Sequence, residues 1–183
     1  EDPEQAVPAA QAAVDRFADL YEAAWAREFR AKLGLAEARE GDVALAQDLL
    51  TAMAENQADF TLTFRALSDL PASGGPATDA AARDLFVDPT AFDAWATRWR
   101  NRLAAEARPD GARRTTMAAI NPLHIPRNHL VEAALRAAEA GDLAPLERLL
   151  EAVASPFEAR AGLEAFAAPA GPGEAVTQTF CGT

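Results

Sequence analysis

Residues 121–141, NPLHIPRNHLVEAALRAAEAG, and residues 142–158, DLAPLERLLEAVASPFE, carry the clearest structural pattern in the chain. From Pro126 onward, apolar residues recur every few positions along one face of a helix. These residues are Leu130, Val131, Ala134, Leu135 and Ala138. Gly141 is well placed to end this helix, Asp142 can cap the next one, and that second helix ends before Pro156. The two stretches predict an αα-hairpin over residues 126–154.

Helical periodicity also covers the first third of the chain. In a long first helix, which Gly34 can end, six large apolar residues are spaced three or four apart. The six are Val14, Phe17, Tyr21, Trp25, Phe29 and Leu33. Asp42 is a suitable N-cap for a second helix, and a third is predicted to begin near Asp59. The buried side of this third helix is expected to carry Phe60, Phe64 and Leu67.

The middle of the chain combines a loop with the heaviest aromatic pattern. Residues 71–76, PASGGP, favour neither helix nor strand, and a loop is predicted over residues 71–83. Asp88 followed by Pro89 is a typical helix start. The apolar stripe of that helix is predicted to lie in the core and consists of Phe92, Trp95, Trp99 and Leu103. A short helix is expected over residues 112–120, and residues 155–183 form an irregular tail. The prediction is one all-α, multi-helix domain over residues 1–183.

Composition and charge exclude some classes of binding partner. The 183 residues include 28 acidic and 17 basic ones, for a formal net charge of −11, and half of them are hydrophobic. Such an acidic surface repels phosphate backbones and anionic lipid, so neither nucleic acid nor a membrane is an expected partner. The single thiol, Cys181, cannot form a disulfide within this chain, which favours a reducing bacterial cytoplasm.

Five phrases in order along the chain resemble the carboxyl end of the selenoprotein O (YdiU) family. They are residues 32–35 (KLGL), 59–67 (DFTLTFRAL), 121–141, 142–158 and 179–183 (TFCGT). The resemblance implies a kinase-like parent that binds ATP and Mg2+ and transfers AMP to Ser, Thr or Tyr hydroxyls of proteins. It also implies that the ATP-handling residues lie upstream. This chain is therefore expected to be a C-terminal fragment, and inactive alone.

The residues themselves predict no catalytic, cofactor-binding or metal-binding set in this chain. Asp59-Phe60-Thr61 lacks the glycine of a kinase Asp-Phe-Gly motif and lies in a helical pattern, which favours Asp59 as a helix cap. The two histidines, His124 and His129, are five residues apart across a proline and do not share a helix face. A metal site is not expected there.

Arg127, Asn128 and His129 form a candidate anion site or a structural joint. They fall in the first turn of a helix, where free N–H groups favour an anion such as a nucleotide phosphate. Alternatively, Arg127 and Asn128 bind backbone carbonyls of residues 120–125 and lock two helices together. The prolines on both sides of that connection, Pro122 and Pro126, favour the structural interpretation.

Two other features remain open. Seven arginines between residues 98 and 127 face only Glu106 and Asp110, and this strip either pairs with acidic helices or meets an acidic partner. Within it, Arg98 and Arg102 are expected to stack beside Trp95 and Trp99. Cys181 is the candidate redox residue, because the resemblance implies a thiol or selenol at this place that can form a disulfide with the kinase-like part.

The interpretation favoured by the sequence is the C-terminal domain of a selenoprotein-O-like protein adenylyltransferase. In it, this piece braces the upstream kinase-like domain of the same polypeptide, and the partners of the parent are its protein substrates. The alternative is a stand-alone helical protein-interaction module. A small helical enzyme is disfavoured, because no polar cluster in the sequence supports one.

Overall fold

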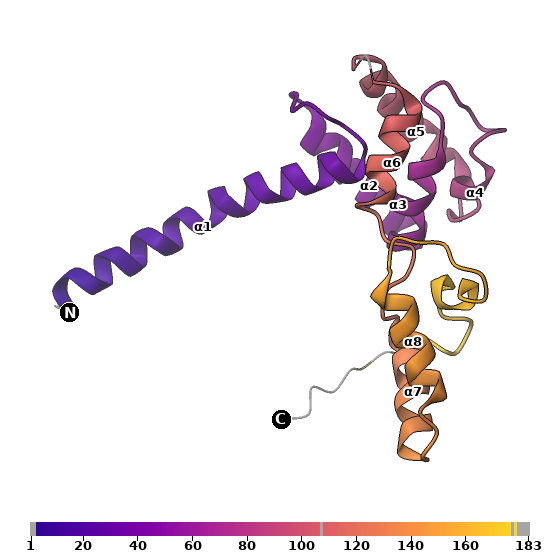
Figure 1. The fold of residues 1–183 in the computed structure, drawn as a ribbon. Coiled ribbons are helices and arrows are strands. Elements are labelled where there is room, and N and C mark those ends of the chain that lie inside the picture. The colour runs from indigo at the N-terminus through magenta and orange to yellow at the C-terminus, as the bar shows by residue number, and fades with distance from the viewer. Residues whose placement is uncertain (1–2, 107, 177, 179–183) are drawn as a thin grey trace.

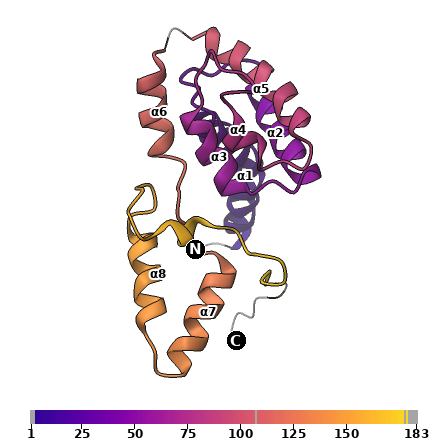
Figure 2. The ribbon, with the colours of Figure 1, turned by 90° about the vertical axis from the view of Figure 1, so that its right-hand side faces the viewer.

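The computed structural model describes residues 3–106, 108–176 and 178, and over these residues the all-α prediction is confirmed (Figures 1 and 2). The described residues form eight α-helices and one 3-10 helix, with no strand. The helices are α1 (Pro3–Lys32), α2 (Asp42–Glu55), α3 (Phe60–Asp69), α4 (Ala80–Arg83), α5 (Pro89–Ala104), α6 (Asp110–Ala118), α7 (Asn128–Glu139), α8 (Ala144–Ala154) and the 3-10 helix η1 (Glu164–Ala167).

Helix α1 is 30 residues long, and only its carboxyl end joins the body of the protein (Figure 1). Phe29 packs on Phe64 with ring centroids 5.9 Å apart, and Leu33 is fully buried. Gly34 follows the helix at φ +75°, and a Cβ there would lie only 2.5 Å from Met117 Sδ. A glycine is therefore required where α1 ends, as the sequence predicted.

The core lies between α2, α3, α5 and the end of α1. Its largest fully buried apolar side chains include Trp99, Phe64, Phe92, Leu33, Leu49 and Leu67. The rings of Trp95 and Trp99 stack with centroids 5.7 Å apart. Each indole N–H donates to a backbone carbonyl, Trp95 to Leu45 at 2.8 Å and Trp99 to Leu33 at 2.9 Å. The prediction that the aromatic stripe of α5 is core is confirmed.

Local predictions at the helix starts have mixed outcomes. Asp59 caps α3 by accepting from the Leu62 N–H at 2.8 Å, and Asp88 caps α5 through the Thr90 N–H at 2.9 Å. Asp42 is not an N-cap: it is the first residue of α2, and its carboxylate accepts from Arg102 instead. Phe60 is 45% exposed, so its predicted burial is wrong. It lies in the first turn of α3, at the edge of the core.

Helices α7 and α8 pack against each other and lie below the α1–α6 body in Figure 1. The expected hairpin range, 126–154, contains both of them, and Gly141 between them has φ +90°. The segment after α8 turns back to the α6–α7 connection, where the Leu123 and His124 N–H groups both donate to the Pro156 carbonyl. Within the expected loop, 71–83, the structure forms the one-turn helix α4.

The burial of Trp99 predicts that Trp99→Ala lowers the free energy of unfolding by ~3–5 kcal/mol, through a cavity and the loss of apolar contacts. Chemical denaturation measures the change. Val87→Ala is the control, because Val87 is 76% exposed and its truncation should stay within about 0.5 kcal/mol. A Trp99→Ala variant as stable as the wild type would contradict the core assignment.

Candidate functional site

The connection between α6 and α7, residues 119–127, is held by buried polar side chains. Asn121 is fully buried, and its amide donates to the Lys32 carbonyl at 3.0 Å and to Ser68 Oγ at 3.2 Å. The first bond satisfies a carbonyl left free where α1 ends, and the second reaches α3. This asparagine therefore fixes the connection to two helices that are distant in sequence.

Arg65, on α3, supplies the hydrogen bonds that the sequence had led us to expect from Arg127. Its Nη1 donates to the carbonyls of Ala118 at 3.1 Å, Asn121 at 3.2 Å and Phe157 at 3.2 Å. One guanidinium thus joins α3, the end of α6 and the segment after α8. Arg65 lies within residues 59–67, and its role is not evident from the sequence, where the only signal is an isolated arginine among apolar residues.

Arg127 binds a carboxylate rather than backbone carbonyls, which corrects its predicted partners. Its Nη1 lies 2.7 Å from Asp59 Oδ2, and its Nη2 lies 3.1 Å from Asp59 Oδ1. Burial raises the pKa of Asp59, but the hydrogen bonds from Arg127 and from the Leu62 N–H outweigh burial, and the pKa falls below its ordinary value. Because both terminal nitrogens of Arg127 are paired, a phosphate would have to compete with Asp59.

The other two residues of the candidate anion site do not join this pair. Asn128 is exposed at the first position of α7, and His129 is partly buried. His129 lines a hollow of about 630 Å³ beside Leu130, Glu132 and Arg136 of α7. The structure thus gives Arg127 a structural partner, while Asn128 and His129 stay candidates from the sequence.

His124 is the more deeply buried of the two histidines. It is 2% exposed, and in the described part of the chain neither ring nitrogen makes a hydrogen bond. Burial lowers the pKa of His124, and the nearby positive charges of Arg160 and Arg65 lower it further. A neutral imidazole is therefore favoured. Over the described residues, no group of three or more histidine, cysteine or acidic side chains could hold a metal ion.

The arginine strip is paired with acidic side chains, as one of the two sequence interpretations predicted. Most of these ion pairs lie between different helices or loops; they are Arg98–Asp48, Arg100–Asp79, Arg102–Asp42, Arg102–Glu106, Arg113–Asp110 and Arg114–Asp69. Over Trp99 lie the guanidiniums of Arg100 and Arg113, at 5.8 and 5.3 Å from the ring centroid. Arg98 and Arg102 were expected to stack beside the tryptophans, but the arginines that lie over Trp99 are Arg100 and Arg113.

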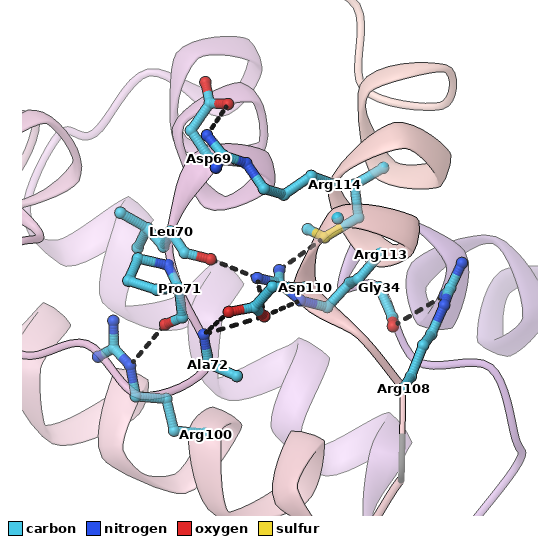
Figure 3. A network of polar contacts seen from close by, with 12 residues as sticks. Gly34, Asp69, Leu70, Pro71, Ala72, Arg100, Arg108, Asp110, Arg113 and Arg114 are labelled. Carbon is cyan, nitrogen blue, oxygen red and sulfur yellow. Dashed lines mark hydrogen bonds and ion pairs between the residues drawn. The ribbon is translucent and has the colours of Figure 1, made fainter.

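Arg113 is the most buried of these cations, at 1% exposure. Figure 3 shows its polar contacts. Its Nη2 donates to the Leu70 carbonyl and, at 3.0 Å, to Asp110 Oδ1. Asp110 also accepts the Ala72 N–H at 3.1 Å, so the pair ties the start of α6 to the loop after α3. Burial raises the pKa of Asp110, but the bonds from Arg113 and Ala72 lower it by more. This network joins α6 to the loop after α3, and the charge of Arg113 is paired within it.

The last two points concern the candidate redox cysteine and membrane-spanning helices. Cys181, the candidate redox residue, lies outside the described residues. A search of the described residues finds no helix that is both long and apolar enough to cross a bilayer.

Comparisons with known proteins give one consistent result. A family model described as protein adenylyltransferase SelO matches residues 6–154. A protein nucleotidyltransferase YdiU from Nitrobacter hamburgensis is 52% identical over 180 residues, which cover 98% of this chain and 35% of the relative. The proteins of that name from Bradyrhizobium diazoefficiens and Methylorubrum extorquens are 51% and 50% identical over all of this chain and 37% and 38% of their own lengths. The matched part is the carboxyl-terminal part of these relatives.

The contacts of Arg65 predict that Arg65→Met lowers the free energy of unfolding by ~1–3 kcal/mol, because three carbonyls lose their donor while the aliphatic stem is retained. Arg65→Lys should recover part of the loss, since an ammonium can donate but lacks the reach of the guanidinium. Urea denaturation measures both variants. Arg16→Met, at an exposed site on α1, is the control, and equal stability of Arg65→Met and wild type would refute the role.

The lowered pKa of His124 predicts a loss of stability between pH 7.5 and 5.5. In the unfolded chain His124 binds a proton at an ordinary pKa of about 6.5, whereas in the folded protein its pKa is lower. The free energy of unfolding is therefore highest above pH 6.5 and decreases as the pH falls below it. His124→Phe should flatten this slope, because the variant lacks the titrating imidazole. Denaturation at five pH values tests this, and the same slope in His124→Phe would count against it.

Proposed function

The chain belongs to the SelO family of protein adenylyltransferases, and on that premise we propose that it is the carboxyl-terminal helical part of an enzyme that transfers AMP from ATP to Ser, Thr or Tyr hydroxyls of proteins. The observation that carries the proposal is the similarity over nearly the whole chain to relatives named protein nucleotidyltransferases. This chain spans 35% to 38% of the length of the three relatives compared above. The activity therefore belongs to a longer polypeptide, with this chain as one part.

Within that polypeptide, the role we propose for residues 1–183 is to brace the preceding kinase-like domain. The described residues do not fit an ATP–Mg2+ site, because they present no group of three metal-capable side chains and their buried or partly buried arginines are bound to carboxylates and carbonyls. Buried ion pairs and carbonyl contacts between elements support a rigid piece, and Arg127 acts in it as a structural joint.

Two further parts of the proposal concern the tail and the partners. A redox role for the Cys181 thiol, through a disulfide with the kinase-like part, remains a prediction from the family resemblance. The partners are the preceding domain and the protein substrates. The formal net charge of −11 supports neither nucleic acid nor an anionic membrane as a partner.

The alternative function, a helical protein-interaction module acting alone, has one observation in its favour. Large apolar side chains of α1 are exposed, among them Phe17 at 66% and Leu20 at 67%. Exposed apolar surface of this kind marks interaction sites. The family membership favours an occupant from the same polypeptide, so the enzyme proposal takes precedence.

The proposal predicts that the isolated chain neither binds Mg-ATP tightly nor labels proteins with AMP, whereas a polypeptide extended upstream to the length of its relatives does both. Titration calorimetry with Mg-ATP and transfer of labelled AMP to a protein mixture measure the two activities. The longer polypeptide serves as the positive control in each assay. Micromolar ATP binding by residues 1–183 alone would overturn the assignment, as would an extended polypeptide that transfers no AMP.

A further inference from the structure

Helix α1 carries a row of exposed apolar side chains along one face. Val7, Val14, Phe17 and Tyr21 are spaced by seven, three and four residues, which places them on the same side of a helix. Their exposed fractions are 70%, 67%, 66% and 57%. We call these four residues the α1 stripe. The side chains of Phe17 and Tyr21 are already stacked, with ring centroids 6.0 Å apart.

The same face of α1 becomes core towards its carboxyl end. Trp25, Phe29 and Leu33 continue the stripe at four-residue spacing, and Leu33 is fully buried. The rings of Trp25 and Phe29 stack at 4.2 Å between centroids, and Phe29 packs on α3. One continuous apolar face is thus covered at one end and bare at the other. In Figure 1, no other described element lies along the bare end.

A groove lies where the bare part of the face meets the body. It has a volume of about 440 Å³ and is lined by Tyr21, Glu22 and Trp25 of α1 and by Val43 and Gln47 of α2. Val43 is 43% exposed and adds apolar surface on the far wall. The groove is large enough for bulky side chains, and it makes the stripe continuous with α2.

We propose that the α1 stripe and this groove are the docking surface for the preceding part of the same polypeptide. The inference rests on the proposed function and adds the surface through which the brace works. Between 62% and 65% of the length of the three relatives lies outside the part that this chain covers, and this chain matches their carboxyl-terminal part. Because α1 is the first helix here, those residues enter at its Pro3 end and stay tethered beside the stripe.

The chemistry of the surface specifies its occupant. Asp15 and Glu22 are exposed along one edge of the stripe, about a quarter to a third of a turn from its centre. An occupant that matches this surface is a helix face with large apolar side chains and basic residues along the bordering edge. Packing of such a face on α1 follows ordinary ridge-and-groove contacts between helices.

Amide hydrogen exchange of α1 tests the inference. In the isolated chain, the amides of residues 7–21 should exchange fast, and in the extended polypeptide they should exchange about tenfold slower or more, because docking suppresses local opening. Phe17→Asp should abolish that slowing in the extended polypeptide. In the isolated chain the same variant should leave the melting temperature unchanged, which excludes a general folding defect.

The matched control is Ala23→Asp, an exposed position on the opposite side of α1, which introduces the same charge and should preserve the slowing. Fast exchange of α1 in the extended wild type, or an unaffected Phe17→Asp variant, would overturn the inference. The inference would also be overturned if α1 were equally protected in the isolated chain and in the extended polypeptide and both formed dimers in sedimentation equilibrium. That result would assign the stripe to a second copy of the chain. AMP transfer is measured in a separate assay. An extended polypeptide that transfers no AMP but protects α1 would refute the proposed function while still supporting the docking surface.

Discussion

The carboxyl end of α1 is the constraint on which the rest of the structure depends. The last carbonyls of a helix have no partner within it, and burying them unpaired is costly. Here the carbonyl of Lys32, the last residue of α1, and those of the two residues after it each accept a hydrogen bond from a side chain elsewhere in the fold. Lys32 accepts from Asn121, Leu33 accepts from Trp99, and Gly34 accepts from Arg108. The end of one helix thereby sets the positions of α5, the segment before α6 and the α6–α7 connection.

Buried arginines extend this arrangement through the body. Removing a guanidinium from water is tolerated only when its donors find acceptors, and a paired guanidinium holds those acceptors in a defined geometry. Arg113 accordingly joins Leu70 and Asp110, and Arg127 joins α7 to the cap of α3. Arg65, which is partly buried, joins three carbonyls in the same way. The cations of this acidic chain are therefore largely structural where they are buried. This supports the proposed bracing role rather than the recruitment of acidic partners.

The two ends of α1 differ for a related reason. Its carboxyl end is covered by α2 and α3, whereas its first half carries equally apolar side chains without cover from any described element. The apolar face of α1 extends beyond the helices that cover it, which indicates that further residues pack there in a larger fold. This agrees with the greater length of the relatives. The family assignment and the exposed face thus rest on independent observations.

The sequence alone determined what depends on local spacing. The all-α class, the aromatic stripe of α5, the caps at Asp59 and Asp88 and the glycine after α1 all follow from interactions within one or two turns, which a linear pattern records. The family also followed from short phrases in order, without any site geometry.

Only the tertiary structure decided which distant groups meet. Asp42 looks like a cap in sequence, but Arg102 lies 60 positions away and takes its carboxylate. Arg127 was assigned nearby carbonyls, yet Asp59, 68 positions away, outcompetes them as a charged bidentate acceptor. Phe60 keeps helical spacing but falls at the edge of the core. Helical periodicity tells which face of each helix is apolar; which side chain pairs with which depends on how the helices pack, and that is fixed only when all of them bury their faces together.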